Sequence, residues 1–199
     1  MLADDDFSPT YLRNATAYGV SARLRGDLVV NNLTGYAYTI GQVLLKSDGT
    51  PWRPLVHIED IARAFLAVVE APRELVHNEA FNVGRTEENY RIRDVAGIVE
   101  SIVPNSVATF AEGASPDLRN YRVDCSKIHD VLPAYQPAWT VPDGVRQLLA
   151  AYVAVGLTRD ALESTTYQRI RHIRDLLESG RLDDTLRWVR ASVPENAGA

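Results

Sequence analysis

The chain has 199 residues, of which 46% are hydrophobic and 24% charged, a composition typical of a globular domain and not of a disordered segment. Its formal net charge of −5 argues against non-specific binding to nucleic acid or to an anionic membrane. No stretch reaches the ~18 uninterrupted apolar residues of a membrane span, and its single cysteine, Cys125, excludes an intrachain disulfide. The acidic first residues resemble no export signal, so we expect a cytoplasmic protein.

Short apolar runs alternate with helical periods along the chain, which predicts an α/β fold. The expected strands are residues 10–13, 43–45, 55–58, 80–84 and, at an edge, 107–110. Helices are expected at residues 27–39, 92–103 and 143–155, and one begins at residue 126. A further helix has Ile61, Phe65, Val68 and Val69 on one face. The helix at 143–155 is indicated by the apolar stripe Val145, Leu148, Leu149, Tyr152 and Val153. Gly, Ser and Pro predict a loop at 112–116.

The composition changes from Thr158 onward. Ile170, Ile173, Leu176 and Leu177 indicate an arginine-rich amphipathic helix, and residues 193–199 resemble a frayed tail. The arginines of this segment are interleaved with acidic residues, which favours a solvated face over a nucleic-acid patch. We therefore divide the chain into residues 1–157 and a helical extension with its tail, 158–199.

Three segments in a fixed order resemble a known family. They are residues 12–19 (LRNATAYG), 48–62 (DGTPWRPLVHIEDIA) and 81–84 (FNVG), with weaker echoes at 31–33 and 116–127. Together they are similar to the C-terminal half of the extended short-chain dehydrogenases/reductases, the NAD-dependent nucleotide-sugar epimerases and dehydratases, over residues 8 to about 150. The resemblance implies the last parallel strands of a Rossmann-type sheet and a small α/β substrate-binding subdomain, followed by the helical extension.

The family's cofactor and catalytic motifs are missing from the sequence. A glycine turn that admits a dinucleotide pyrophosphate is absent, because the two nearest glycines, Gly35 and Gly41, are six residues apart. The resemblance also calls for a Tyr general acid/base with a Lys four residues later. The only lysines, Lys46 and Lys127, have Gln42 and Val123 at that spacing. We therefore expect no catalytic residue here, an inactive chain on its own, and the N-terminal half as a possible separate partner chain.

Arg53 is the residue that the resemblance places at the nucleotide diphosphate, and a guanidinium fork suits phosphate oxygens. The alternative is a surface arginine tied to Glu59 or Asp60. Arg119 occupies the loop in which relatives often bring an arginine to the second phosphate, although the usual position, three residues before the aspartate, holds Ala114.

The resemblance also places residues around the base, the sugar and the nicotinamide of NAD, the family cofactor. Asn32 and Leu33 would meet the phosphates and base, although Asn32 is equally compatible with helix capping. Thr16 stands where many relatives carry a substrate-binding asparagine. Ala17 and Tyr18 would lie near the nicotinamide, the alternative for Tyr18 being an aromatic wedged under a turn. NAD binding by this chain alone is not expected.

The remaining residues support neither a metal site nor another catalytic centre. His57 lies among apolar strand residues, which favours a structural histidine, and the scattered histidines have no metal-ligand spacing. The sequence therefore predicts the substrate-binding half of a nucleotide-sugar epimerase/dehydratase-like enzyme, with a nucleotide sugar as ligand. The alternative is a non-catalytic sugar-nucleotide-binding or protein-interaction module. An autonomous enzyme using other groups lacks any recognisable nucleophile–base pair. Residues 10–13 would form an exposed sheet edge unless a partner covers them.

Overall fold

The computed structural model describes residues 3–115 and 120–189. Within them, the strands form three small sheets. The strands are β1 (Thr10–Asn14), β2 (Thr16–Tyr18), β3 (Gln42–Ser47), β4 (Trp52–His57), β5 (Glu79–Val83), β6 (Asn89–Arg91) and β7 (Val107–Ser115). β1 pairs with β5, β2 with β4, and β3 with β7, all in parallel, whereas β4 and β6 are antiparallel. The predicted mixed α/β class with parallel strands is confirmed.

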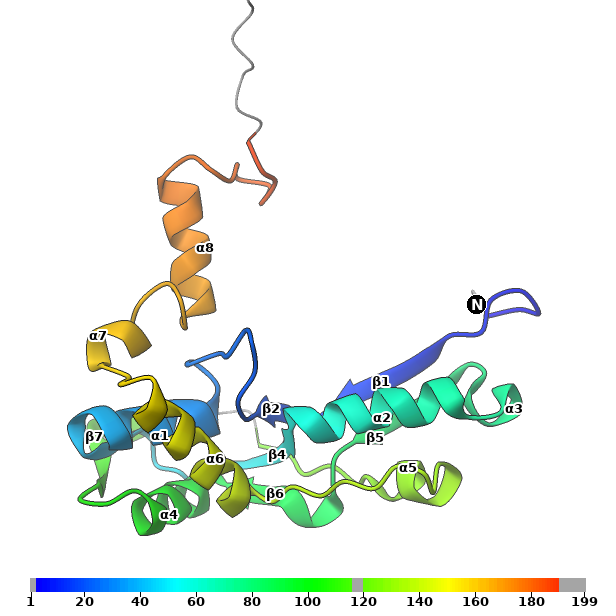
Figure 1. Ribbon diagram of the computed structural model, residues 1–199, viewed down its shortest axis with the longest axis horizontal. Coiled ribbons are helices and arrows are strands. Elements are labelled where there is room, and N and C mark those ends of the chain that lie inside the picture. The colour runs from blue at the N-terminus through cyan, green and yellow to red at the C-terminus, as the bar shows by residue number, and fades with distance from the viewer. Residues whose placement is uncertain (1–2, 116–119, 190–199) are drawn as a thin grey trace, which may run out of the picture.

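Helices connect and cover these strands (Figure 1). They are α1 (Val29–Ile40), α2 (Ile58–Glu70), α3 (Arg73–Val76), the 3-10 helix η1 (Thr86–Glu88), α4 (Ile92–Ile102), α5 (Ser126–Val131), α6 (Val141–Ala154), α7 (Arg159–Leu162) and α8 (Arg169–Glu178). The expected helices are present within two residues of their predicted starts, except that Ile58 opens α2 instead of ending β4. None of the helices in the described ranges is long and apolar enough to cross a membrane.

Two hydrophobic cores lie at opposite ends of the body. One is built where α1, α4 and α6 pack around β3, and its most buried members include Val30, Val43 and Leu148. The other lies between α2, α5 and β5 and includes Phe81 and Ile128. The central sheet β2–β4–β6 contributes Leu55 to the first core and Val56 to the second, because successive strand residues face opposite sides of a sheet.

The apolar face predicted for α2 is only half right. Ile61 is buried and Val68 packs on the second core, but Phe65 and Val69 are 53% and 79% exposed. The buried stripe contains Ala64 and Ala67 instead, so the helix approaches its sheet through small side chains. Because α2 is apolar on two faces, hydrophobic periodicity alone cannot determine which of them is buried.

Two further expectations are corrected by tertiary pairing. The loop predicted from residue 112 is strand up to Ser115, since β3 continues alongside β7 after a register shift between Leu45 and Ser47. On α6, Val145, Leu148 and Tyr152 are buried as expected, but Val153 is 56% exposed because it faces away from α1 and α4. The tail predicted at 193–199 lies outside the described residues.

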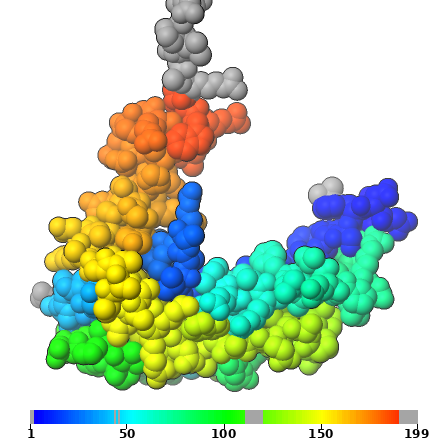
Figure 2. All heavy atoms as spheres, viewed as in Figure 1, coloured from blue at the N-terminus to red at the C-terminus, as the bar shows by residue number. Residues whose placement is uncertain are grey.

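The helical segment after residue 157 projects from one end of the body, with α8 standing above α7 (Figures 1 and 2). Its first part is not detached, because Leu162 is fully buried in the first core. On α8, Leu176 is buried but Ile170 is 57% exposed, so the amphipathic stripe is covered only near the end of the helix.

Candidate functional site

The residues predicted near the sugar and nicotinamide lie in β2, beside β4. The parallel register aligns Thr16 with Leu55, Ala17 with Val56 and Tyr18 with His57. Tyr18 and His57 therefore end their strands side by side. Ligands of α/β proteins bind outside the carboxyl ends of parallel strands, so this edge is where a site is expected.

His57 is a structural residue, as the sequence predicted. Its side chain is fully buried, and its ring stacks on Trp139 with the ring centroids 3.9 Å apart. Nδ1 accepts a hydrogen bond from the Glu59 amide (3.2 Å), which caps α2, and Nε2 lies 2.8 Å from Gln147 Oε1. Because that amide oxygen can only accept, Nε2 carries the proton and the ring is neutral. Both nitrogens are used, so neither is available for catalysis.

Burial lowers the pKa of His57 below its ordinary value, the hydrogen bond to Gln147 opposing the shift. The unfolded chain therefore takes up a proton at higher pH than the folded chain does, and His57 makes the free energy of unfolding fall as the pH drops below about 6.5. We expect His57→Gln to show a shallower loss of stability than wild type between pH 7.5 and 5.5, the difference being at most about 1.4 kcal/mol per pH unit. Urea unfolding at several pH values measures this, and parallel profiles would contradict it.

Tyr18 is a wedge beneath the turn that follows β2. Its side chain is 2% exposed and packs so closely on α6 that a Cβ added at Gly144 would lie 2.2 Å from the Tyr18 ring. Burial raises the pKa of Tyr18 above its ordinary value, and its hydroxyl has no hydrogen-bond partner in the described part of the chain. A neutral phenol in this position is not poised to act as a base.

The start of α1 is tied to that same turn by two asparagines. Asn31 accepts a hydrogen bond from the Gly19 amide (3.0 Å) and donates one to the Arg25 carbonyl (3.0 Å). Asn32 donates to the Gly26 carbonyl (2.8 Å), and Leu33 is buried in the first core. The helix begins after Leu28 without a side-chain cap, so the capping role considered for Asn32 is wrong. Sequence reasoning missed Asn31, whose partners are set by the fold.

Arg53 is not the surface arginine of the alternative interpretation. Arg53 is 9% exposed and donates a hydrogen bond to the Trp52 carbonyl (2.7 Å). Its guanidinium carbon lies 5.5 Å from the centroid of the Tyr121 ring. Asp60 pairs instead with Arg63 at 2.7 Å. A desolvated guanidinium next to an aromatic ring is well suited to a planar or phosphorylated ligand. Arg119, the other predicted phosphate ligand, lies outside the described residues.

Further cations surround the Trp52 ring at the beginning of β4. Arg91 and Arg122 lie over it at 5.2 and 4.7 Å from the ring centroid, and the Trp52 amide donates to Asn120 Oδ1 (3.0 Å). Thus β4 carries Arg53 and an aromatic–arginine cluster at its start and His57 at its end. No local sequence pattern marks this cluster, since Tyr121 and Arg122 are about 70 residues from Trp52 along the chain.

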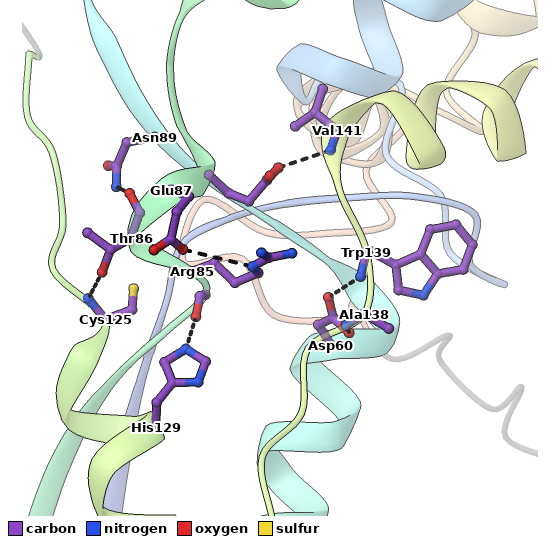
Figure 3. A network of polar contacts seen from close by, with 12 residues as sticks. Asp60, Arg85, Thr86, Glu87, Asn89, Cys125, His129, Ala138, Trp139 and Val141 are labelled. Carbon is purple, nitrogen blue, oxygen red and sulfur yellow. Dashed lines mark hydrogen bonds and ion pairs between the residues drawn. The ribbon is translucent and has the colours of Figure 1, made fainter. Parts of the chain in front are cut away.

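Buried carboxylates attach the chain from residue 120 to 141 to the body (Figure 3). Asp60, which is 2% exposed, accepts hydrogen bonds from the backbone amides of Ala138 (2.9 Å) and Trp139 (3.0 Å). Glu88 accepts a hydrogen bond from the backbone amide of Val141 (3.0 Å) at the start of α6. Burial raises the pKa of Glu88 above its ordinary value, but its hydrogen bonds show that its role here is structural.

The same segment is held from its other side by Thr86 and Asn89. Thr86 Oγ1 accepts a hydrogen bond from the Cys125 amide (2.9 Å) (Figure 3). Asn89 exchanges two hydrogen bonds with the Val123 backbone (2.9 Å each). Burial raises the pKa of Cys125 to about 11, so it is a protonated thiol and not a nucleophile. In the described residues, no group of three or more His, Cys, Asp or Glu could hold a metal ion.

Residues 2–84 match the model of the NAD dependent epimerase/dehydratase family. Over these residues, the chain is similar to that family. This confirms the resemblance inferred from the segments that lie between residues 12 and 84, and NAD as the family's cofactor, since several solved structures with this fold are NAD complexes.

Solved structures extend the likeness of fold beyond the matched segment. UDP-glucuronic acid 4-epimerase from Bacillus cereus, in complex with UDP-glucuronic acid and NAD, is 24% identical with a TM-score of 0.61, over 72% of this chain and 45% of that chain. UDP-glucose 4-epimerase from Thermotoga maritima, with UDP-glucose, is 21% identical with a TM-score of 0.63, over 76% and 48%. An epimerase from Methanothermobacter thermautotrophicus is 19% identical with a TM-score of 0.64, over 75% and 44%. The chain thus spans less than half the length of each.

Proposed function

We propose that this chain is the substrate-binding half of an NAD-dependent nucleotide-sugar epimerase/dehydratase-like enzyme. The observation that carries the proposal is Arg53, a buried arginine beside Tyr121 in a chain whose matched family acts on nucleotide sugars. Arg53 would bind the diphosphate, with Asn32 and Leu33 near the base and Arg119 as a second phosphate ligand. Thr16, in β2, would contact the sugar.

The residues present suit only one end of NAD. Ala17 and Tyr18 end β2 at the edge where the nicotinamide would lie, and NAD when bound supplies a hydride acceptor. The pyrophosphate requires a glycine turn, and the sequence has no Gly-x-Gly-x-x-Gly run. We therefore assign this chain the tasks of binding and orienting the sugar nucleotide, and assign the NAD pyrophosphate and the Tyr/Lys pair to a cofactor-binding unit made of other residues.

The first test is titration calorimetry of the chain with UDP-glucose, dTDP-glucose and NAD. We expect sugar-nucleotide binding to weaken about 10- to 100-fold in Arg53→Gln, the loss typical of a charge-assisted hydrogen bond. Arg146→Gln is the matched control, since Arg146 is exposed and pairs only with Asp143 among the described residues. Equal affinities of wild type and Arg53→Gln would refute the role of Arg53, and tight NAD binding would refute the division of tasks.

The partner unit would cover β1. In the described residues β1 pairs only with β5, which leaves a row of backbone groups at its other edge, and Tyr11 on it is 48% exposed. Mixing the chain with the cofactor-binding half of a complete relative should restore NAD-dependent sugar turnover and protect the β1 amides from hydrogen exchange. Protection without turnover favours the second candidate, a non-catalytic interaction module, for which the exposed Phe65, Leu66 and Val69 of α2 would be the docking face.

A further inference from the structure

The segment that follows α8 forms a closed loop, residues 181–189, which we call the Trp188 loop. Leu182 pairs with Trp188 across the loop as an antiparallel bridge. Leu182 is buried, and its amide donates a hydrogen bond to the carbonyl of Leu176 in α8 (3.0 Å). At the turn of the loop, the Asp183 carboxylate accepts hydrogen bonds from two backbone amides, at 2.9 Å each. The Trp188 loop therefore has a fixed conformation at the end of α8.

The large apolar side chains of this loop are exposed instead of packing on the body. Trp188 is 65% exposed, and Leu186 and Val189 are each more than half exposed. Leu186 also has φ +61°, a left-handed conformation that is unfavourable for a residue with a large side chain. A strained backbone that displays apolar side chains is a sign of a binding surface. Tryptophan is among the residues that most often dominate such a surface.

A groove that fits one large side chain lies between the end of α2 and the segment that follows α5. Its volume is about 230 Å³, below the ~300–1,000 Å³ that is usual for small-molecule sites. Its lining is apolar, with Ala67, Leu75 and Leu132 among its members, except for Glu70. A narrow apolar groove of this kind suits a single anchoring side chain of another protein.

The two surfaces carry opposite charges. The guanidinium carbon of Arg181 lies 5.9 Å from the centroid of the Trp188 ring. Glu70 is the one charged residue that lines the groove. Neither Arg181 nor Glu70 forms an ion pair with another residue in the described part of the chain. Figure 1 shows α8 and the end of α2 next to α3 at opposite ends of the body, so the Trp188 loop cannot reach the groove of its own chain.

We propose that the Trp188 loop of one copy of this chain places Trp188 in the groove of a second copy, where Arg181 pairs with Glu70. Because the two surfaces are different, each contact leaves a free groove on one copy and a free loop on the other. Association is therefore head to tail and continues beyond a dimer, into a ring or an open chain. A contact made through one anchoring side chain buries less than the ~1,000 Å² of a stable interface, so it is weak.

Sedimentation equilibrium of the full chain from about 1 µM to 1 mM tests the proposal. The monomer has a mass of 22.1 kDa, and we expect the average mass to rise past that of a dimer. Trp188→Ala should weaken association at least about 30-fold, the loss typical of an aromatic anchor. Ala134→Arg, which fills the groove and adds a cation to it, should do the same. Phe65→Ala is the matched control, because this exposed aromatic of α2 does not line the groove.

A mixture of two variants tests the head-to-tail geometry. Trp188→Ala keeps its groove and Ala134→Arg keeps its loop, so each alone should be monomeric, and the two together should form a one-to-one complex that grows no further. Glu70→Arg and Arg181→Glu should each weaken association by up to about 5-fold, and the double variant should recover it. Circular dichroism checks that each variant is folded.

A chain that stays monomeric at every concentration overturns the proposal, as does a mixture that forms no complex. Association that stops at a dimer, and is lost in Trp188→Ala but kept in Ala134→Arg, means that two loops contact each other and that the groove has no role. Association lost in Phe65→Ala but kept in Trp188→Ala assigns the contact to the outer face of α2 and also overturns the proposal. None of these outcomes depends on sugar-nucleotide binding, so the proposed function is tested separately.

Discussion

Gly19→Ala is expected to destabilise the protein by about 2–5 kcal/mol, combining backbone strain with overpacking. Gly19 has φ +108°, a conformation that residues with a Cβ rarely adopt. A Cβ at this position would lie 2.3 Å from Nε2 of His57. The His57 ring cannot move aside, because Trp139 stacks on it and Gln147 accepts a hydrogen bond from it. Urea unfolding followed by circular dichroism measures the change.

Gly97→Ala is the matched control for this substitution. Gly97 lies in α4, and a Cβ there would meet nothing within 4 Å. Alanine is the better helix former, so this variant should gain about 0.5–1 kcal/mol. The two variants share the same chemical change, and only the surroundings differ. Similar free energies of unfolding for both would show that the turn after β2 is not packed on His57.

The second large effect is expected for Leu162→Ala, with a loss of about 2–5 kcal/mol from the cavity left in the core. Leu162 is fully buried and occupies the space that side chains on two glycines would need. A Cβ would lie 2.8 Å from it at Gly35 and 3.0 Å from it at Gly26. Thermal unfolding should show one transition, displaced to lower temperature.

Ile170→Ala supplies the comparison within the same C-terminal segment. Ile170 is 57% exposed, so its truncation should change the free energy of unfolding by no more than about 0.5 kcal/mol. The pair also tests the division at residues 157 and 158, which stays a prediction. If Leu162→Ala is as mild as Ile170→Ala, the segment folds apart from the body. A large effect assigns α7 to the first core.

The order of strands and helices could be predicted from local sequence. β5 is an apolar run between turn residues, and α4 ends before Pro104 as a helix must when proline follows. The buried face of α2 could not be predicted in the same way, because Phe65 and Ile61 are equally apolar. Only the sheet beneath the helix selects Ala64 and Ala67 for the interior.

In the candidate site, too, some features could be predicted from local sequence and others depend on the tertiary structure. Local sequence carries the resemblance to the family, the lack of a glycine turn and a Tyr/Lys pair in these residues, and the prediction of a binding role for Arg53, because each of these depends on residue types at short, fixed spacings. The tertiary structure alone decided that Arg53 is buried beside Tyr121 and that Ala71 and Leu132 line one groove. These partners are 68 and 61 residues apart along the chain. Contacts at such separations arise from the packing of whole elements, which no local pattern records.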